Sequence, residues 1–145
     1  MGDVEEPTFF AHLRDTSLIF QGDEECIPKS IELFTAMGLP KSLLPLKDII
    51  ETGWDEASGF SWTITRGEQQ HHFIKADRLC AYDEVVTATI TKGRMANISG
   101  VKAKELGIYV PVNEIYVDES NPNEKKLVFK SILGLSRTMA FDLFD

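Results

Sequence analysis

The chain has 145 residues, of which 43% are hydrophobic, so it is long and apolar enough for one globular domain with its own core. Its formal net charge of −8 at pH 7 argues against a nucleic-acid partner. No apolar run approaches the roughly 20 residues that cross a bilayer, and the acidic start does not resemble a secretion signal, so we expect no transmembrane segment and a cytoplasmic location.

The first part of the chain has helical spacing. Phe9, Leu13, Thr16 and Phe20 recur at steps of three to four residues, which places them on one face of a helix. The spacing therefore predicts a first, amphipathic helix over Phe9–Phe20. Such a helix could lie over the rest of the fold as a lid.

A second helix is predicted before residue 38. Pro28 suits the first turn of a helix, and the acidic run over residues 23–25 suits the positive end of the helix dipole. Gly38 supplies a residue that can adopt the left-handed conformation and close the helix. Pro40 and Pro45 then prevent its continuation.

From residue 46 onward, apolar residues alternate with polar ones, and glycine or asparagine turns separate the runs. The runs span residues 46–54, 60–64, 72–75, 78–82, 85–91, 95–101, 108–117, 125–132 and 138–144. Their short connections favour antiparallel neighbours, since a parallel pair needs a crossover of about a dozen residues. Pro111 indicates that the run over 108–117 is an edge strand or contains a bulge.

This pattern predicts a mainly β (α+β) fold. We expect an antiparallel β-sandwich or a coiled, barrel-like sheet of about eight strands, with one or two N-terminal helices packed on it.

The sequence offers little that would hold a metal or a cofactor. His71 and His72 are adjacent, so on a strand they point to opposite faces, and His12 has no partner at a ligand spacing. The glycines are spaced as turns rather than as a phosphate-binding loop. We therefore expect no metal and no cofactor. Cys26 and Cys80 are expected to be free thiols.

A hydrolytic site is weakly indicated. The segment from Gly134 to Thr138 lacks the final glycine of a nucleophile elbow, and it leaves Ser136 in a turn. A serine, His71 or His72 and an aspartate could be combined into a triad, but only geometry would give that choice meaning. Whether the protein is an enzyme therefore stays open, and binding without catalysis is favoured.

Aromatic residues on the predicted strands are the best indication of a ligand. The set comprises Trp54, Phe60, Trp62, Phe73, Phe129, Phe141 and Phe144. These rings could fill a solid core, or they could line a cavity for an apolar molecule. In the second case, Phe60, Trp62, Phe129 and Phe141 are the candidate ligand-binding residues.

Four sequence motifs, taken in order, resemble the plant domain-of-unknown-function family 538. They are Gly38-Leu-Pro-Lys-Ser-Leu-Leu-Pro45, Gly53-Trp54 followed by Ser58-Gly-Phe-Ser-Trp62, Gly100-Val-Lys-Ala-Lys-Glu-Leu106, and Gly134-Leu-Ser-Arg-Thr138 with Ala140-Phe141. The resemblance covers about residues 26–145. It implies a single β-rich domain there, preceded by a variable, partly helical leader over residues 1–25.

The resemblance also implies a plant source and a β-rich fold similar to the lipid-binding lobes of bactericidal permeability-increasing proteins. Roles proposed for the family include apolar ligand binding, chlorophyll binding or breakdown, and stress response. The family offers no accepted catalytic residues.

Our leading hypothesis is a monomeric, non-enzymatic protein that holds a small apolar or lipid-like ligand between sheet and helix. Two alternatives remain. One is an esterase-like hydrolase acting on an apolar ester such as a pigment. The other is a protein-interaction module with a filled core and an exposed edge strand over residues 108–117.

Overall fold

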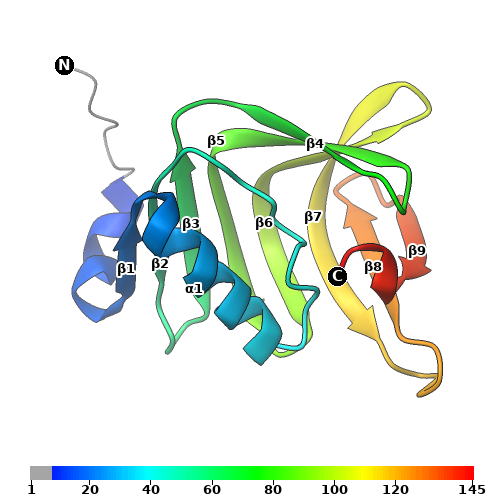
Figure 1. The fold of residues 1–145 in the computed structure, drawn as a ribbon, viewed down its shortest axis with the longest axis horizontal. Helices are drawn as coiled ribbons and strands as arrows, with labels where there is room; N and C mark the ends of the chain where they lie inside the picture. The colour runs from blue at the N-terminus through cyan, green and yellow to red at the C-terminus, as the bar shows by residue number, and fades with distance from the viewer. Residues whose placement is uncertain (1–7) are drawn as a thin grey trace.

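In the computed structural model, which describes residues 8–145, nine strands form one curved antiparallel sheet (Figure 1). The strands are β1 (Leu18–Gln21), β2 (Ile49–Trp54), β3 (Phe60–Thr65), β4 (Gln69–Phe73), β5 (Arg78–Thr91), β6 (Arg94–Glu105), β7 (Ile108–Asp118), β8 (Lys126–Ser131) and β9 (Ser136–Ala140). They lie in the order β1-β2-β3-β5-β6-β7-β8-β9, and β4 pairs with β5 beside β3. The mainly β class with a packed helix is confirmed, in the form of one coiled sheet rather than a sandwich.

The longest strand, β5, joins two parts of the sheet. The predicted runs over 78–82 and 85–91 form one strand, whose first half pairs with β4 and whose second half pairs with β3. Gly100 of β6 lies where the pairing with β5 shifts register, and it has a φ of 89°. An added Cβ there would lie 2.4 Å from the carbonyl oxygen of Val85. The bend in the sheet therefore requires glycine.

The predicted helix over Phe9–Phe20 is wrong in its second half. The chain forms a 3₁₀ helix, η1 (Thr8–Thr16), and then strand β1, in which Phe20 pairs with Thr52 of β2. The free edge of β2 offers backbone partners to this segment, and that pairing overrides the helical spacing. The part of the predicted leader over residues 1–7 lies outside the described residues.

Helix α1 (Gly22–Ala36) begins earlier than predicted, because Pro28 lies inside it rather than in its first turn. The acidic run over 23–25 occupies its first turn as expected, and the Asp23 carboxylate accepts hydrogen bonds from the Ile49 and Asp48 amides at 2.7 and 3.2 Å. This contact fixes the start of the helix against β2. Gly38 follows the helix with a φ of 74°, which confirms its predicted closing role.

No helix within residues 8–145 combines the length and hydropathy of a membrane-crossing segment.

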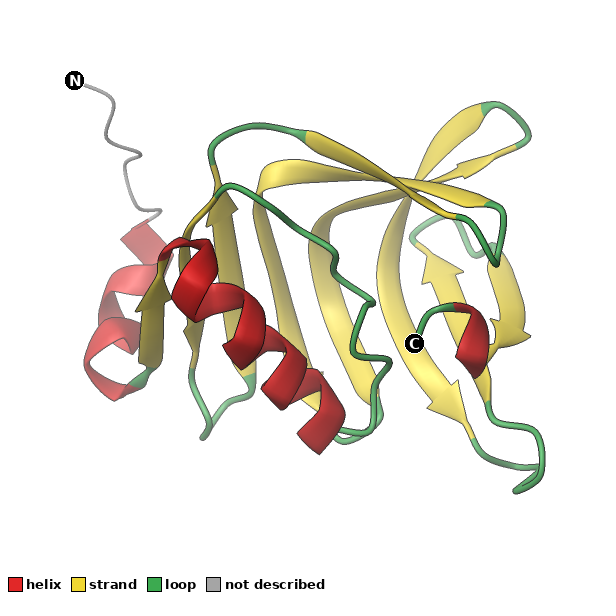
Figure 2. Ribbon diagram, in the orientation of Figure 1, coloured by secondary structure: helices red, strands yellow, loops and turns green. Residues whose placement is uncertain are grey.

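The main core lies between the sheet and α1, with the loop that contains Pro40 and Pro45 crossing the same face (Figure 2). Phe144 closes the core, because its ring centroid lies 5.1 Å from those of both Phe73 and Phe129. The predicted last strand is therefore too long. The chain leaves the sheet after β9 and forms a short 3₁₀ helix, η2 (Phe141–Leu143), which lets Phe144 reach the core.

Of the two alternatives predicted for Pro111, the edge strand is wrong, whereas the irregular pairing expected of a bulge is present, because the register of β7 with β8 shifts between Val112 and Glu114. Strand β7 lies between β6 and β8, and Pro111 pairs with Lys102 of β6. Pairing with β8 begins only at Val112, so the missing amide of Pro111 falls beyond the last residue pair of β7 and β8. The proposed interaction through an edge strand over 108–117 therefore loses its structural basis.

The two cysteines are free and buried, as expected. Burial raises the pKa of Cys80 to about 11 and also raises the pKa of Cys26. Since the thiolate is the reactive form, we expect both thiols to react slowly with a disulfide reagent in the folded protein and rapidly in urea. A thiol titration with and without urea measures this, and rapid release of one equivalent without urea would contradict it.

Candidate functional site

An apolar groove of about 310 Å³ lies between α1 and the strands β1 and β2. Its walls are formed by Leu18, Phe20, Lys29, Ser30, Glu32, Leu33, Ala36, Met37, Thr52 and Trp54. The pairing of β1 with β2 creates one wall, because it places Leu18 opposite Trp54 and Phe20 opposite Thr52. Leu18 is 55% exposed, so the groove is open to solvent along an apolar rim.

A second hollow, of about 140 Å³, lies on the other side of α1, toward the loop with the two prolines. Ser30, Leu33 and Thr52 line both hollows. A hollow therefore lies between α1 and its surroundings on each of two sides. Within α1 itself only Cys26 and Phe34 are buried.

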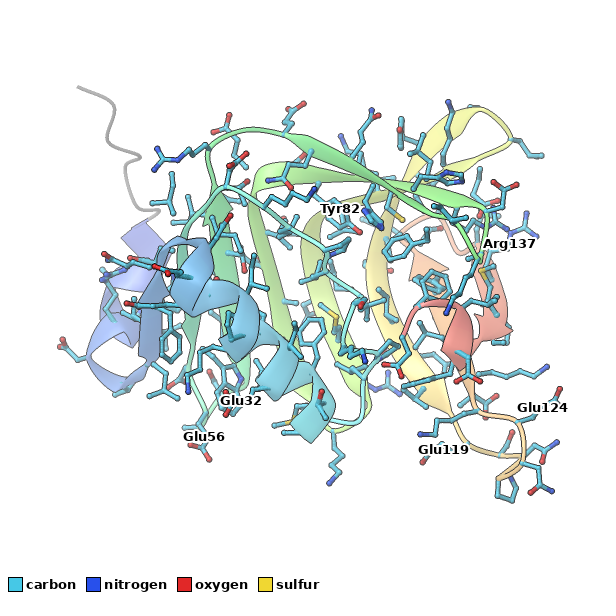
Figure 3. All side chains as sticks on the ribbon, in the orientation of Figure 1. Glu32, Glu56, Tyr82, Glu119, Glu124 and Arg137 are labelled. Atoms are coloured by element: carbon cyan, nitrogen blue, oxygen red, sulfur yellow. The ribbon has the colours of Figure 1, made fainter. Side chains whose placement is uncertain are left out.

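The groove carries a few polar groups at its border. The Lys29 ammonium lies 5.7 Å from the centroid of the Phe20 ring and 3.4 Å from the Glu32 carboxylate, which Figure 3 labels on α1. The indole nitrogen of Trp54 is buried and has no hydrogen-bond partner among residues 8–145. A ligand with an apolar body and a polar end would therefore find matching groups in this groove.

The centre of the curved sheet is filled. The hollow among the core residues, which include Phe73, Tyr82 and Phe129, measures only about 20 Å³, enough for about one water molecule. Figure 3 shows Tyr82 in this interior, and burial raises its pKa well above the ordinary value. An organic ligand fits beside α1 rather than inside the sheet.

Two of the predicted ligand residues, Phe60 and Trp62, lie away from the groove. Both belong to β3 and pack with Ile64 in a small cluster that is separate from the main core. Leu13 of η1 covers this small cluster. Their ring centroids are 6.2 Å apart, and Trp62 has no exposed surface. They serve as packing between the sheet and η1.

The other two, Phe129 and Phe141, are also separated from this groove. Phe129 packs on Phe144 in the core and borders a different hollow, between β7 and β9. Phe141 is buried under the Lys125 ammonium, which lies 4.7 Å from its ring centroid. The structure therefore does not bring the four predicted residues to one cavity.

Sequence reasoning missed most of the groove because it assigned Phe20 to a helix. A signal was available, since Leu18 and Phe20 alternate as the residues of a strand do. Trp54 was included in the wider aromatic set, and it is the member of that set that lines the groove.

A catalytic arrangement of Ser136 with a histidine is not formed. Nε2 of His72 lies 2.9 Å from the Asp77 carboxylate, and the His71 ring packs edge-on against Phe73. Within residues 8–145, no hydrogen bond joins Ser136 to either histidine, and no group of three or more His, Cys, Asp or Glu side chains is placed to hold a metal ion.

Comparison with curated proteins and comparison with solved structures each gave no match. Residues 30–145 match the family described as a protein of unknown function, DUF538, and because this match covers most of the chain, the chain belongs to that family.

Proposed function

We propose that the protein binds a single-chain amphiphile, such as a fatty acid, in the groove between α1 and the strands β1 and β2. The observation that supports this most directly is the apolar groove of about 310 Å³ with Lys29 at its border. Sites for small organic molecules span roughly 300–1,000 Å³ and have mostly apolar walls with a few polar groups. We further propose that the protein is a monomer in the plant cytoplasm and that it carries its ligand without chemical change.

Each end of such a ligand has a partner in the groove. The apolar chain would contact Leu33, Met37 and the Trp54 ring, and a carboxylate would meet the Lys29 ammonium at the solvent side. A ligand acceptor that reached the Trp54 indole nitrogen would also satisfy a donor whose burial without a partner costs about 1–3 kcal/mol.

Helix α1 takes the lid role that the sequence suggested for the segment before it. Only two residues of α1 are buried and a hollow lies on each side of it, whereas its first turn is fixed by Asp23 and its last turn by the hydrogen bond from the Gly93 amide to the Met37 carbonyl at 2.6 Å. Weakly packed elements open at low free-energy cost, so the middle turns of α1, between these two fixed ends, can move outward to admit a ligand.

The two tryptophans allow a direct test of this site. Trp54 lines the groove, and Trp62 is sealed on the other face of the sheet. A fatty acid that carries bromine on its chain quenches indole fluorescence at short range, so we expect it to quench Trp54 and leave Trp62 bright. The Trp54→Phe variant should then show no quenching, although it still binds a fluorescent fatty acid. Quenching that persists in Trp54→Phe would place the ligand elsewhere.

A matched pair of substitutions tests the same groove by filling it. Ala36 lines the groove and is exposed, and the neighbouring Thr35 is exposed on α1 but does not line either hollow. We expect Ala36→Phe to weaken binding of the brominated fatty acid by at least about tenfold and Thr35→Phe to leave it unchanged. Equal affinities for the two variants would contradict the proposal.

A further inference from the structure

Three turns at one end of the sheet expose large aliphatic side chains. They are the β4–β5, β6–β7 and β8–β9 turns, and they share one end because Cys80 pairs with Ala103 and Val112 with Ser131 (Figure 1). The exposed residues are Ile74, Leu106, Ile108, Ile132, Leu133 and Leu135.

These exposed residues are gathered at one end of the sheet rather than spread over the surface. Leu106 is 95% exposed, Ile74 81% and Leu133 71%. Of the eight large hydrophobic residues that are exposed within residues 11–145, where burial is described, six lie on these three turns. Single exposed aliphatic residues are common on any protein, but a gathering of this size marks a surface that meets an apolar partner.

One carboxylate holds the three hairpins in place. Glu105 of β6 forms an ion pair with Arg78 at the start of β5, at 3.2 Å, and accepts a hydrogen bond from Arg137 of β9 at 3.0 Å. The turns are therefore fixed relative to one another before any partner arrives. A groove of about 270 Å³ with mainly apolar walls separates the β6–β7 and β8–β9 hairpins just behind them.

The same end is basic in an acidic protein. Residues 72–78, 102–110 and 130–137, which contain the three turns, hold six lysines and arginines against two carboxylates, Asp77 and Glu105. This gives the end a formal charge of +4, whereas the whole chain has −8. The β7–β8 turn at the opposite end carries Glu119 and Glu124, and Figure 3 shows them far from Arg137.

We propose that this end, which we call the tip surface, docks on an anionic lipid bilayer. The tip surface consists of the three turns and the six basic residues beside them. The aliphatic side chains stand on three separate turns, and a groove lies between two of these turns, so the surface that they form is uneven. A lipid surface closes around each of them, while lysines and arginines meet the anionic headgroups. The acidic remainder of the chain is repelled and stays in water, which sets the orientation.

The proposal is independent of the amphiphile groove. The tip surface contains no residue of α1, β1 or β2, and the groove contains no residue of the three turns. Failure at one site can therefore be separated from failure at the other.

The test is flotation of the full chain with large vesicles of phosphatidylcholine, alone or with about 30% phosphatidylserine. We expect binding only to the phosphatidylserine vesicles and loss of binding in high salt. The variants Leu106→Asn and Leu133→Asn remove side chains that are mostly exposed, so the fold should be unchanged. We expect their combination to weaken binding by about tenfold or more.

Matched controls complete the test. Ile31→Asn removes an exposed aliphatic residue from α1 and should bind vesicles as the natural chain does. Lys75→Glu with Lys104→Glu should abolish the preference for phosphatidylserine. The Leu106→Asn, Leu133→Asn variant should still show fatty-acid quenching of Trp54, and Ala36→Phe should still float with vesicles.

Three results would overturn the proposal. The first is no flotation with either vesicle, and the second is equal flotation of the natural chain and the Leu106→Asn, Leu133→Asn variant. The third is self-association of the natural chain that these two substitutions abolish, which would make the tip surface an interface between copies of the chain.

Discussion

Replacing Gly53 with alanine is expected to lower the free energy of unfolding by about 3 kcal/mol, the upper range for an overpacked core. Gly53 of β2 lies opposite Trp62 of β3, and an ideal Cβ at this position would lie 2.1 Å from Cζ2 of the indole ring. The ring cannot easily move aside, because Trp62 is fully buried and its Nε1 donates to the Glu51 carboxylate at 2.9 Å. Urea denaturation of the two proteins measures the difference.

A double-mutant cycle identifies the cause. In a Trp62→Leu background the six-membered ring that meets the new Cβ is gone, so Gly53→Ala should cost less than about 1 kcal/mol there. Gly67→Ala is the matched control, because a Cβ at Gly67 has no neighbour within 4 Å, and it should be nearly neutral. The same cost for Gly53→Ala in both backgrounds would show that the ring contact is not the source.

The strand pattern was readable from the sequence because alternation reports burial on one face, and the face that packs on α1 is buried along most of the sheet. The predictions were wrong where the structure of a segment depends on a pairing or packing partner far away in the sequence. Leu18–Gln21 became a strand because β2 had a free edge, and the predicted strand over 138–144 stopped at Ala140 because Phe144 turns into the core. Such long-range partners are not visible in a local spacing.

The candidate groove was harder to predict, because the sequence shows which residues are apolar but not which faces stay uncovered. Phe60 and Trp62 looked equivalent to Trp54, yet η1 covers their face of the sheet, whereas α1 leaves Trp54 beside a hollow. The tip surface had a visible signal that was not used. Leu106-Gly-Ile108 and Ile132-Leu-Gly-Leu135 place aliphatic residues in glycine turns, where solvent exposure is the normal condition.

The contact of η1 with the sheet depends on a buried carboxylate. The Glu51 side chain is 7% exposed and accepts two hydrogen bonds from Arg14, at 2.7 and 3.1 Å, in addition to the one from Trp62. Burial alone would raise the pKa of Glu51, but the hydrogen bonds from Arg14 and Trp62 and the guanidinium charge together hold it below the ordinary value of 4.5. The charged form is therefore the one that the fold stabilises.

Glu51→Gln is expected to lower the free energy of unfolding by about 2 kcal/mol or more at neutral pH, because the amide nitrogen of glutamine repels the guanidinium that the carboxylate attracted. The contribution also depends on pH. Since the folded pKa is below the unfolded one, the unfolded chain takes up the proton first, so the stabilisation is fully present above about pH 4.5 and is lost as the pH falls further. Urea denaturation at a series of pH values should therefore show a shallower acid decline for Glu51→Gln.

The exposed Glu56, which Figure 3 labels on the turn between β2 and β3, provides the matched control. Glu56→Gln removes the same charge from the same hairpin, so a general electrostatic effect would change both variants alike. We expect Glu56→Gln to keep the stability and the acid decline of the natural chain. Because Arg14 belongs to η1 and Glu51 to β2, an unchanged Glu51→Gln would mean that η1 is held by its apolar contact through Leu13 rather than by this ion pair.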